Sequence, residues 1–140
     1  MFITFEGTEG AGKTTQIESL KQFFEEKGRQ VLITREPGGT KFGQLIRNIL
    51  LDPKTSLSHH YSESLLFTVD RLEHVKTVVQ PALDRGEVVI SDRYIDSTMV
   101  YQHGGRELPY EAVMQLLSFV ELVPTITFLL DISPEEGLAR

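Results

Sequence analysis

A glycine-rich segment near the start of the chain has the residue types and spacing that bind phosphate. Residues 7–14 read Gly-Thr-Glu-Gly-Ala-Gly-Lys-Thr, which fits the pattern G-x-x-x-x-G-K-[ST]. Glycines let the backbone wrap closely around an anion, and the helix predicted from Thr15 turns its positive end towards the same place. Lys13 supplies a charge for the β- and γ-phosphates, and Thr14 a hydroxyl for Mg²⁺. The predicted nucleotide-phosphate ligands are Gly7, Thr8, Glu9, Gly10, Ala11, Gly12, Lys13, Thr14 and Thr15.

The alternative for this segment is a glycine-rich turn that binds nothing. The apolar run at residues 2–6 argues against it, because a phosphate loop requires a strand before it and a helix after it.

A second set of residues suited to phosphate follows the apolar run Val88–Ile90. An acid at the end of a strand beside a phosphate loop is placed to hold Mg²⁺ or its water shell, so Asp92 joins Thr14 as a predicted metal ligand. Arg93 comes next, at the sheet edge where ligands bind in α/β proteins. An ion pair that caps the following helix is the alternative for Asp92 and Arg93. The cations that would neutralise two phosphate groups are Lys13, Arg35, Arg71 and Arg93.

Phe67 and Arg71 are suited to binding a nucleobase. Their spacing in a helical segment puts both on one face. The aromatic ring can stack on a base while the guanidinium donates to a carbonyl. The alternative is a core phenylalanine with a surface arginine. The four histidines show no metal-ligand spacing with carboxylates, and we expect them to be solvated or structural.

Apolar runs typical of strands alternate with segments of helical periodicity. Strands are predicted at residues 2–6, 31–34, 88–90 and 125–130, and helices after the phosphate loop, at 42–50, at 62–79 with a kink or restart at Pro81, and after Pro109. The two late strands are continuously apolar, which is typical of a parallel sheet covered on both faces. We therefore predict an α/β fold, a P-loop NTPase-type parallel sheet with helices on both faces in three layers.

Composition narrows the class of protein. A length of 140 residues with 40% hydrophobic and 24% charged residues is typical of one soluble globular domain. The net charge of −6 repels polyanions, which favours a small nucleotide over nucleic acid as the ligand. No apolar stretch is long enough to span a bilayer and no signal-peptide pattern is present, so we predict no membrane partner and a cytoplasmic location. Without cysteine, disulfides and thiolate metal sites are excluded.

The last residues carry a helix start. Ser133 is a capping residue, Pro134 stands at the first helical position, and Glu136 lies three residues after the cap. Because so few residues follow, we expect the domain to be incomplete at its C-terminus, a naturally frayed end being the alternative.

Taken together, these motifs resemble the bacterial thymidylate kinases. The segments that carry the resemblance are Phe5–Gln16, Thr34–Thr40, Leu66–Arg71, Asp92–Tyr94, Ser97 and Tyr101-Gln102, and they cover the whole chain in the right order. The resemblance implies a single P-loop nucleoside monophosphate kinase domain over residues 1–140. It also implies the reaction MgATP + dTMP giving dTDP and ADP in dTTP biosynthesis, with ATP and Mg²⁺ as cofactors, in a homodimer.

The resemblance further implies a role for each matching residue. Phe67 would stack on thymine and Arg71 would bond its O4 carbonyl. Tyr101 would lie against the deoxyribose and disfavour a 2′-hydroxyl, and Glu9 would approach the sugar 3′-hydroxyl. The other implied dTMP ligands are Thr98 and Gln102 near the base, Arg93 and Arg35 at the phosphate, and Pro37 in the acceptor pocket.

Catalysis in such an enzyme is alignment of two mutually repelling phosphates with neutralisation of their charge, and the predicted catalytic residues are Lys13, Arg93 and Glu9. One branch of the family has an arginine inside the phosphate loop, where this chain has Gly10. The other branch supplies arginines from a mobile lid, which the resemblance places beyond Arg140.

Two other functions stay open on the sequence. A deoxynucleoside kinase would share the fold and the Asp-Arg element, but it needs a carboxylate base at the acceptor hydroxyl, for which Glu36 is the candidate. A non-catalytic nucleotide-binding fragment is the second alternative. A regulatory GTPase is disfavoured because its N-K-x-D and D-x-x-G motifs are absent.

Overall fold

The computed structural model describes residues 1–139. The chain forms two compact units. Unit 1 contains residues 1–35, residues 82–94 and the segment from Val123 onward, and unit 2 contains residues 36–81 and 95–122. Among the described residues, no helix is long and apolar enough to cross a membrane.

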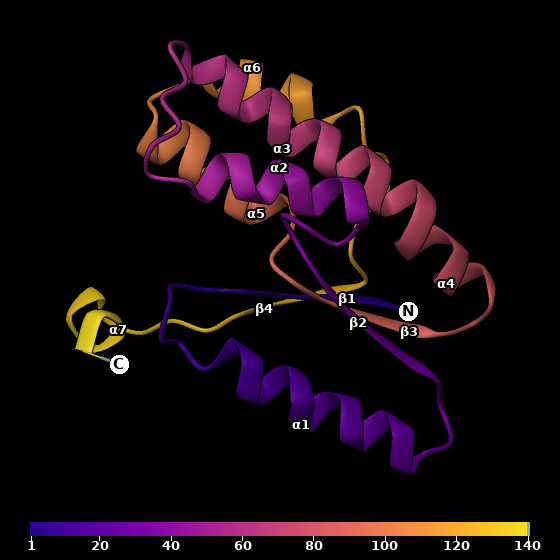
Figure 1. Ribbon diagram of the computed structural model, residues 1–140. Coiled ribbons are helices and arrows are strands. Elements are labelled where there is room, and N and C mark those ends of the chain that lie inside the picture. Colours follow the sequence, from indigo (N-terminus) through magenta and orange to yellow (C-terminus); the bar gives the residue numbers. More distant parts are fainter. Residues whose placement is uncertain (140) are drawn as a thin grey trace. The chain divides into compact units, whose positions relative to one another are not determined.

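Unit 1 is built on a parallel sheet (Figure 1). Its strands are β1 (Phe2–Glu6), β2 (Val31–Arg35), β3 (Val88–Asp92) and β4 (Ile126–Leu129), in the order β2-β3-β1-β4. All three pairings are parallel, which confirms the predicted α/β class. Phe5 of β1 and Arg35 of β2 both pair with Asp92 of β3, so the carboxyl ends of these strands meet at one edge of the sheet.

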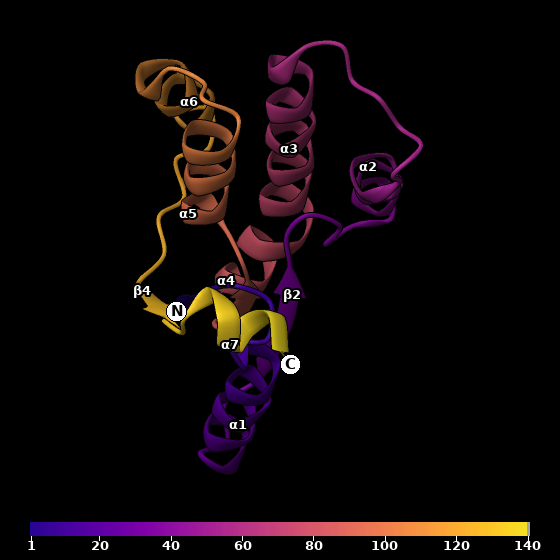
Figure 2. The ribbon, with the colours of Figure 1, turned by 90° about the vertical axis from the view of Figure 1, so that its left-hand side faces the viewer.

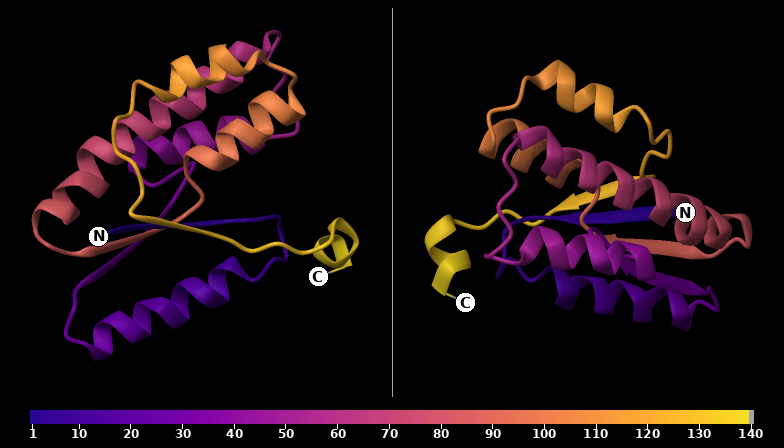
Figure 3. Two further views of the ribbon diagram at one scale, coloured as in Figure 1. Left: turned by 180° about the vertical axis from the view of Figure 1, so that it is seen from behind. Right: turned by 45° about the horizontal axis from the view of Figure 1, so that its top comes forward.

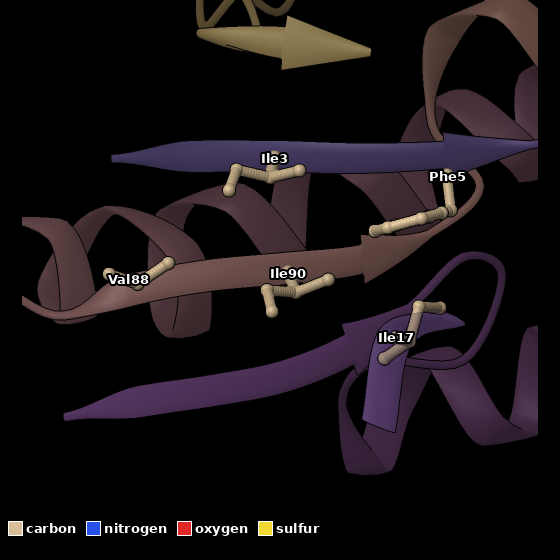
Figure 4. Close-up of a cluster of buried hydrophobic side chains, with 5 residues drawn as sticks. All are labelled: Ile3, Phe5, Ile17, Val88 and Ile90. Carbon is tan, nitrogen blue, oxygen red and sulfur yellow. The ribbon is translucent and has the colours of Figure 1, made fainter. Parts of the chain in front are cut away.

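Helix α1 (Lys13–Glu26) covers the central strands of unit 1. Ile17 packs among Ile3, Phe5, Val88 and Ile90 in a cluster of almost fully buried side chains (Figure 4). Each such side chain contributes roughly 1.5–3 kcal/mol by leaving water. The cluster therefore holds the start of α1, and the loop before it, against the sheet.

Strand β4 differs from the other strands, because its four side chains are exposed. It pairs only with β1 and lies at the edge of the sheet (Figure 3). The prediction that both late apolar runs are covered on both faces is therefore right for β3 and wrong for β4 in the described part of the chain. The predicted helix start is present as α7 (Pro134–Ala139), whose Glu136 N–H donates to Ser133 Oγ at 3.2 Å.

Unit 2 is helical. Its main helices are α2 (Lys41–Leu51), α3 (His60–His74) and α6 (Tyr110–Leu117), and α3 packs against both α2 and α6 (Figure 2). Helix α2 begins where the sequence predicts, with Gly43 N–H donating to the Thr40 side chain at 2.7 Å.

Two segments of unit 2 depart from the sequence prediction. The long helix predicted at 62–79 becomes α3 followed by the π-helical segment η1 (Val75–Val79), and α4 (Gln80–Asp84) continues from it. Pro81 lies inside α4 and lacks an N–H, so the wider π-turn stands where an α-helical hydrogen bond is missing. The helical segments α5 (Ile95–Thr98) and η2 (Met99–Gly105) were not predicted.

Candidate active site

The phosphate loop of unit 1 has the backbone geometry that its glycines predict. Gly7 has φ of 143°, and a Cβ there would lie 2.5 Å from the carbonyl oxygen of Leu130, so only glycine fits. Gly12 is the N-cap of α1 with φ of 90°. Because glycine has no side chain, no capping side chain accepts hydrogen bonds from the N–H groups of the first helical turn. N–H groups at the start of a helix point towards the loop before it, where an anion can bind.

Lys13 follows the loop as the first residue of α1. Its side chain is buried, and Nζ donates to the carbonyl oxygens of Gly7 and Thr8, at 2.9 Å each. Burial lowers the pKa of Lys13, and the positive charge of Arg93 lowers it further, while Asp92, Glu9 and Glu6 act in the opposite direction. The loop therefore holds a desolvated cation beside a second cation, and an anion bound there would relieve both.

The turn after β3 is tightly held. Arg93 has φ of 71°, a left-handed conformation that is strained for a side chain of this size. Three hydrogen bonds keep it: Arg93 N–H donates to Phe5 O at 2.9 Å, Tyr94 N–H to Glu6 Oε1 at 2.8 Å, and Ser91 Oγ–H to Arg93 O at 2.8 Å. Buried Glu6, at the end of β1, thus fixes the backbone on which Arg93 stands.

Asp92 fits the metal-binding role that the sequence predicts. Its Oδ1 is buried and has no hydrogen-bond partner among residues 1–139. A buried carboxylate oxygen without a partner is costly unless a ligand satisfies it. The described residues contain no group of three or more His, Cys, Asp or Glu side chains arranged for a metal. Mg²⁺ is usually held by one or two protein ligands together with phosphates and water.

The base-binding residues predicted from the sequence lie in unit 2. Arg71 is only 2% exposed, whereas Phe67 of the same helix is half-buried. Arg71 Nε–H donates to Glu36 Oε2 at 2.7 Å, and Nη2–H to Thr98 Oγ1 at 2.8 Å. The alternative of a core phenylalanine with a surface arginine is therefore wrong.

Behind Arg71 lies a buried polar network that sequence reasoning missed. His74 is fully buried, and its Nδ1 lies 2.8 Å from Glu36 Oε1. Asp70 accepts a hydrogen bond from Gly38 N–H, at 3.1 Å to Oδ1. Burial raises the pKa of Asp70, and the charge of Glu36 adds to this, while the Gly38 N–H, His74 and Arg71 oppose it. The spacing of residues 70, 71 and 74 on one helix was the only available signal.

Gln102 is buried and held at both ends of its amide. Oε1 accepts from Ser64 Oγ at 2.5 Å, and Nε2 donates to Glu63 Oε1 at 3.0 Å. Glu63 in turn accepts from Arg106 Nε–H at 3.1 Å. The neighbouring residue Tyr101 is exposed, so of these two predicted substrate residues in η2 one is buried and the other faces solvent.

The structure therefore distributes the predicted site residues over the two units. Unit 1 holds the phosphate loop with Lys13 and exposed Glu9, the Asp92-Arg93 turn, and exposed Arg35 at the end of β2. Unit 2 holds Arg71 with Thr98, and the remaining predicted substrate residues are Pro37, Phe67, Tyr101 and Gln102. Half-buried Pro37 accepts a hydrogen bond at its carbonyl from Arg47 Nη1 at 3.0 Å.

Comparison with known proteins decides the family. The profile of the thymidylate kinase family matches residues 5–140. The chain belongs to the thymidylate kinase family. It is 48% identical over 139 residues to a thymidylate kinase of Bifidobacterium longum (strain DJO10A), covering 96% of this chain and 68% of that one. It is 50% identical over 141 residues to that of Sulfurihydrogenibium sp. (strain YO3AOP1), covering 99% and 69%.

A solved thymidylate kinase has the same fold. The crystal structure of the Ehrlichia chaffeensis enzyme matches with a TM-score of 0.87 at 39% identity, covering 99% of this chain and 76% of that one. Family membership confirms the prediction of a phosphotransferase that phosphorylates dTMP for dTTP synthesis, and no finding favours the deoxynucleoside kinase. The chain spans between 60% and 69% of the length of the relatives it matches in sequence.

Proposed function

We propose that this protein transfers the γ-phosphoryl group of MgATP to dTMP, with unit 1 binding the phosphates and unit 2 binding the thymine base. The observation that carries the proposal is that the carboxylate of Glu36 is already hydrogen-bonded at both oxygens. Both carboxylate oxygens of Glu36 are engaged, Oε2 by Arg71 and Oε1 by His74. A deoxynucleoside kinase would need such a carboxylate to accept the proton of a sugar hydroxyl. A monophosphate needs no base, because its attacking oxygen is already anionic.

In unit 1, the chain's own groups align and neutralise the phosphates. Lys13 leaves the loop carbonyls for the transferring phosphoryl group, and the backbone of Gly7–Gly12 cradles the remaining ATP phosphates. Arg93 and Arg35 bind the phosphate of dTMP. Thr14 would hold Mg²⁺ together with the Asp92 oxygen that has no hydrogen-bond partner among residues 1–139. A metal ion held by these residues would supply neutralisation of charge on the phosphates. Glu9 approaches the 3′-hydroxyl.

In unit 2, the acceptor base is bound by side chains of which Arg71, Thr98 and Gln102 are already hydrogen-bonded. Arg71 donates to the O4 carbonyl of thymine, with Thr98 beside it, and Phe67 stacks on the ring. Gln102 lies near the base in an orientation set by Ser64 and Glu63. Tyr101, which is exposed, contacts the deoxyribose in this proposal, and Pro37 lines the acceptor pocket.

The function is tested by measuring ADP formation from MgATP with dTMP, dCMP and thymidine as acceptors. For the full-length protein we expect ADP formation with dTMP, much less with dCMP, and none with thymidine. Turnover of thymidine in place of dTMP would support the deoxynucleoside kinase. ATP binding without transfer to any acceptor would support a non-catalytic nucleotide-binding protein.

We also propose that the protein is a homodimer that associates through α2 and α3. These two helices pack together, and both carry large exposed apolar side chains, namely Phe42, Leu45, Ile49, Leu65, Val69 and Leu72. Apolar residues concentrated on neighbouring elements mark association surfaces. Light scattering should give twice the chain mass. Leu45→Glu should give monomers, and Phe23→Glu, at an exposed position of α1, should leave the mass unchanged. A cytoplasmic location stays a prediction.

A further inference from the structure

The proposed phosphoryl transfer gives no role to Glu36 or His74, yet both belong to the buried polar residues of the chain. Glu36 is 4% exposed and His74 is 0% exposed. A buried charge is retained only where it is paired, and a broken pair costs far more than an exposed one. Glu36 contacts Arg71 directly, and His74 contacts Glu36. The two residues therefore bear on how the Arg71 side chain is held.

The guanidinium of Arg71 is fixed on two sides. Glu36 Oε2 holds Nε–H at 2.7 Å, and Thr98 Oγ1 holds Nη2–H at 2.8 Å. Because a guanidinium is planar, fixing two of its N–H groups fixes the plane of the whole group and the direction of its other N–H bonds. Glu36 therefore sets the direction in which Arg71 can donate.

Glu36 is itself held from the other side. His74 Nδ1 lies 2.8 Å from Oε1, so the carboxylate cannot rotate away from Arg71 without losing this contact. The His74 ring lies so close to Gly39 that a Cβ there would collide with it. Asp70 binds the N–H of Gly38. Residues 70, 71 and 74 of α3 thus clamp residues 36–39 at several points.

We propose that Glu36 and His74 are positioning residues for base selection, with Glu36 orienting the guanidinium of Arg71 and His74 locking Glu36. This inference rests on the proposed function, in which Arg71 reads the O4 carbonyl of thymine. Cytosine has an amino group at that position, so two donors would face each other when the guanidinium is held in place. A loosely held guanidinium would turn aside and tolerate the amino group. Orientation, more than charge, therefore determines the preference for thymine.

The test compares kcat/KM for dTMP and dCMP in matched variants. Glu36→Gln keeps the size of the side chain but places an amide N–H₂ against Arg71 or His74. Losing a hydrogen bond to a charged group corresponds to roughly a tenfold to hundredfold change. We expect KM for dTMP to rise by about that factor and the dTMP preference to fall, with KM for ATP unchanged. Glu73→Gln, at the exposed position before His74, should change neither quantity.

A second pair of variants covers the case in which Glu36→Gln does not fold. His74→Asn can place its amide nitrogen near the position of Nδ1 and should keep most of the base preference. His74→Leu cannot donate to Glu36 and should lose it. Each variant is accepted only if KM for ATP matches that of the original protein. Equal losses with dTMP and dCMP, or an unchanged preference in both Glu36→Gln and His74→Leu, would overturn the inference while leaving the proposed function intact. Failure of the original protein to phosphorylate dTMP would overturn both.

Discussion

The two units hold their functional residues by different means. In unit 1 the proposed phosphate site is made mostly of backbone groups that are neighbours in the chain, from Gly7 to Lys13, at the start of one helix. In unit 2 the proposed base site depends on side chains from positions as distant as Glu36, Arg71 and Thr98. A charged ligand can be bound by local backbone geometry, whereas a neutral base has to be read by side chains brought together by the fold.

The two proposed sites also differ in how far their charged groups are paired. In unit 1, Lys13 has a lowered pKa beside Arg93, and Asp92 has a buried oxygen without a partner in residues 1–139. In unit 2 the charge of Arg71 is met by Glu36 at 2.7 Å. The proposed phosphate site therefore suits charged ligands. The proposed base site suits an uncharged ring that accepts hydrogen bonds from donors with fixed directions.

The largest expected effect is on the stability of unit 2. Arg71→Ala leaves Glu36 buried without its ion partner, which costs about 3–5 kcal/mol in the free energy of unfolding. The same change should narrow the gap in kcat/KM between dTMP and dCMP. Denaturant unfolding and competition assays measure the two effects. Arg35→Ala, in unit 1, should cost less than about 1 kcal/mol of stability, because its side chain is exposed. Equal losses of stability would break the contrast between the units.

Activity should depend most on the phosphate loop. Lys13→Ala removes one positioned electrostatic donor, so kcat should fall by at least roughly a hundredfold, or about 3 kcal/mol of transition-state stabilisation. Steady-state assays of ADP formation measure this loss. Lys21→Ala, further along α1, is the control and should leave kcat unchanged. A Lys13→Ala protein with most of its activity would contradict the assignment of the loop.

A smaller effect is expected at the metal site. Asp92→Asn removes the negative charge from the oxygen that has no partner in the described part of the chain, so the Mg²⁺ concentration for half-maximal activity should rise by roughly tenfold. Titration of activity with Mg²⁺ at saturating ATP gives this value. Asp84→Asn, at an exposed position of α4 in unit 1, should not change it. An unchanged Mg²⁺ requirement in Asp92→Asn would remove Asp92 from the metal site.

The smallest effect concerns Asp70 and pH. Burial raises the pKa of Asp70 above 3.8, so the folded state binds a proton more tightly than the unfolded state. Its contribution to stability therefore falls as pH rises from about 3.8 through the raised pKa. Asp70→Asn should remove this slope, so that unfolding curves of the two proteins differ in a pH-dependent way above pH 3.8. Parallel stability curves over that range would show that the Asp70 pKa is not raised.

Much of the fold was predictable because its signals are local. The strands predicted at 2–6, 31–34 and 88–90, the phosphate loop and the cap of α7 all depend on residues within a few positions of one another. Exposure of β4, the π-turn before Pro81 and the helical segment at 95–105 were not predicted. The exposure of β4 depends on which strands and helices pack beside it, and the two helical segments have irregular hydrophobic periodicity.

By itself, the sequence determined the chemistry at the phosphate end, because a strand, a glycine-rich turn and a helix start place backbone N–H groups and Lys13 whatever surrounds them. It also carried the family resemblance, through short motifs in the right order. Only the tertiary structure showed that Arg71 is buried and that both carboxylate oxygens of Glu36 are hydrogen-bonded, one to Arg71 and one to His74. It also showed that Asp70 binds the N–H of Gly38 and so connects this turn to α3. Such side-chain networks join positions more than 30 residues apart. Residue spacing in the sequence does not predict these contacts, because the packing of the helices determines which buried polar groups meet.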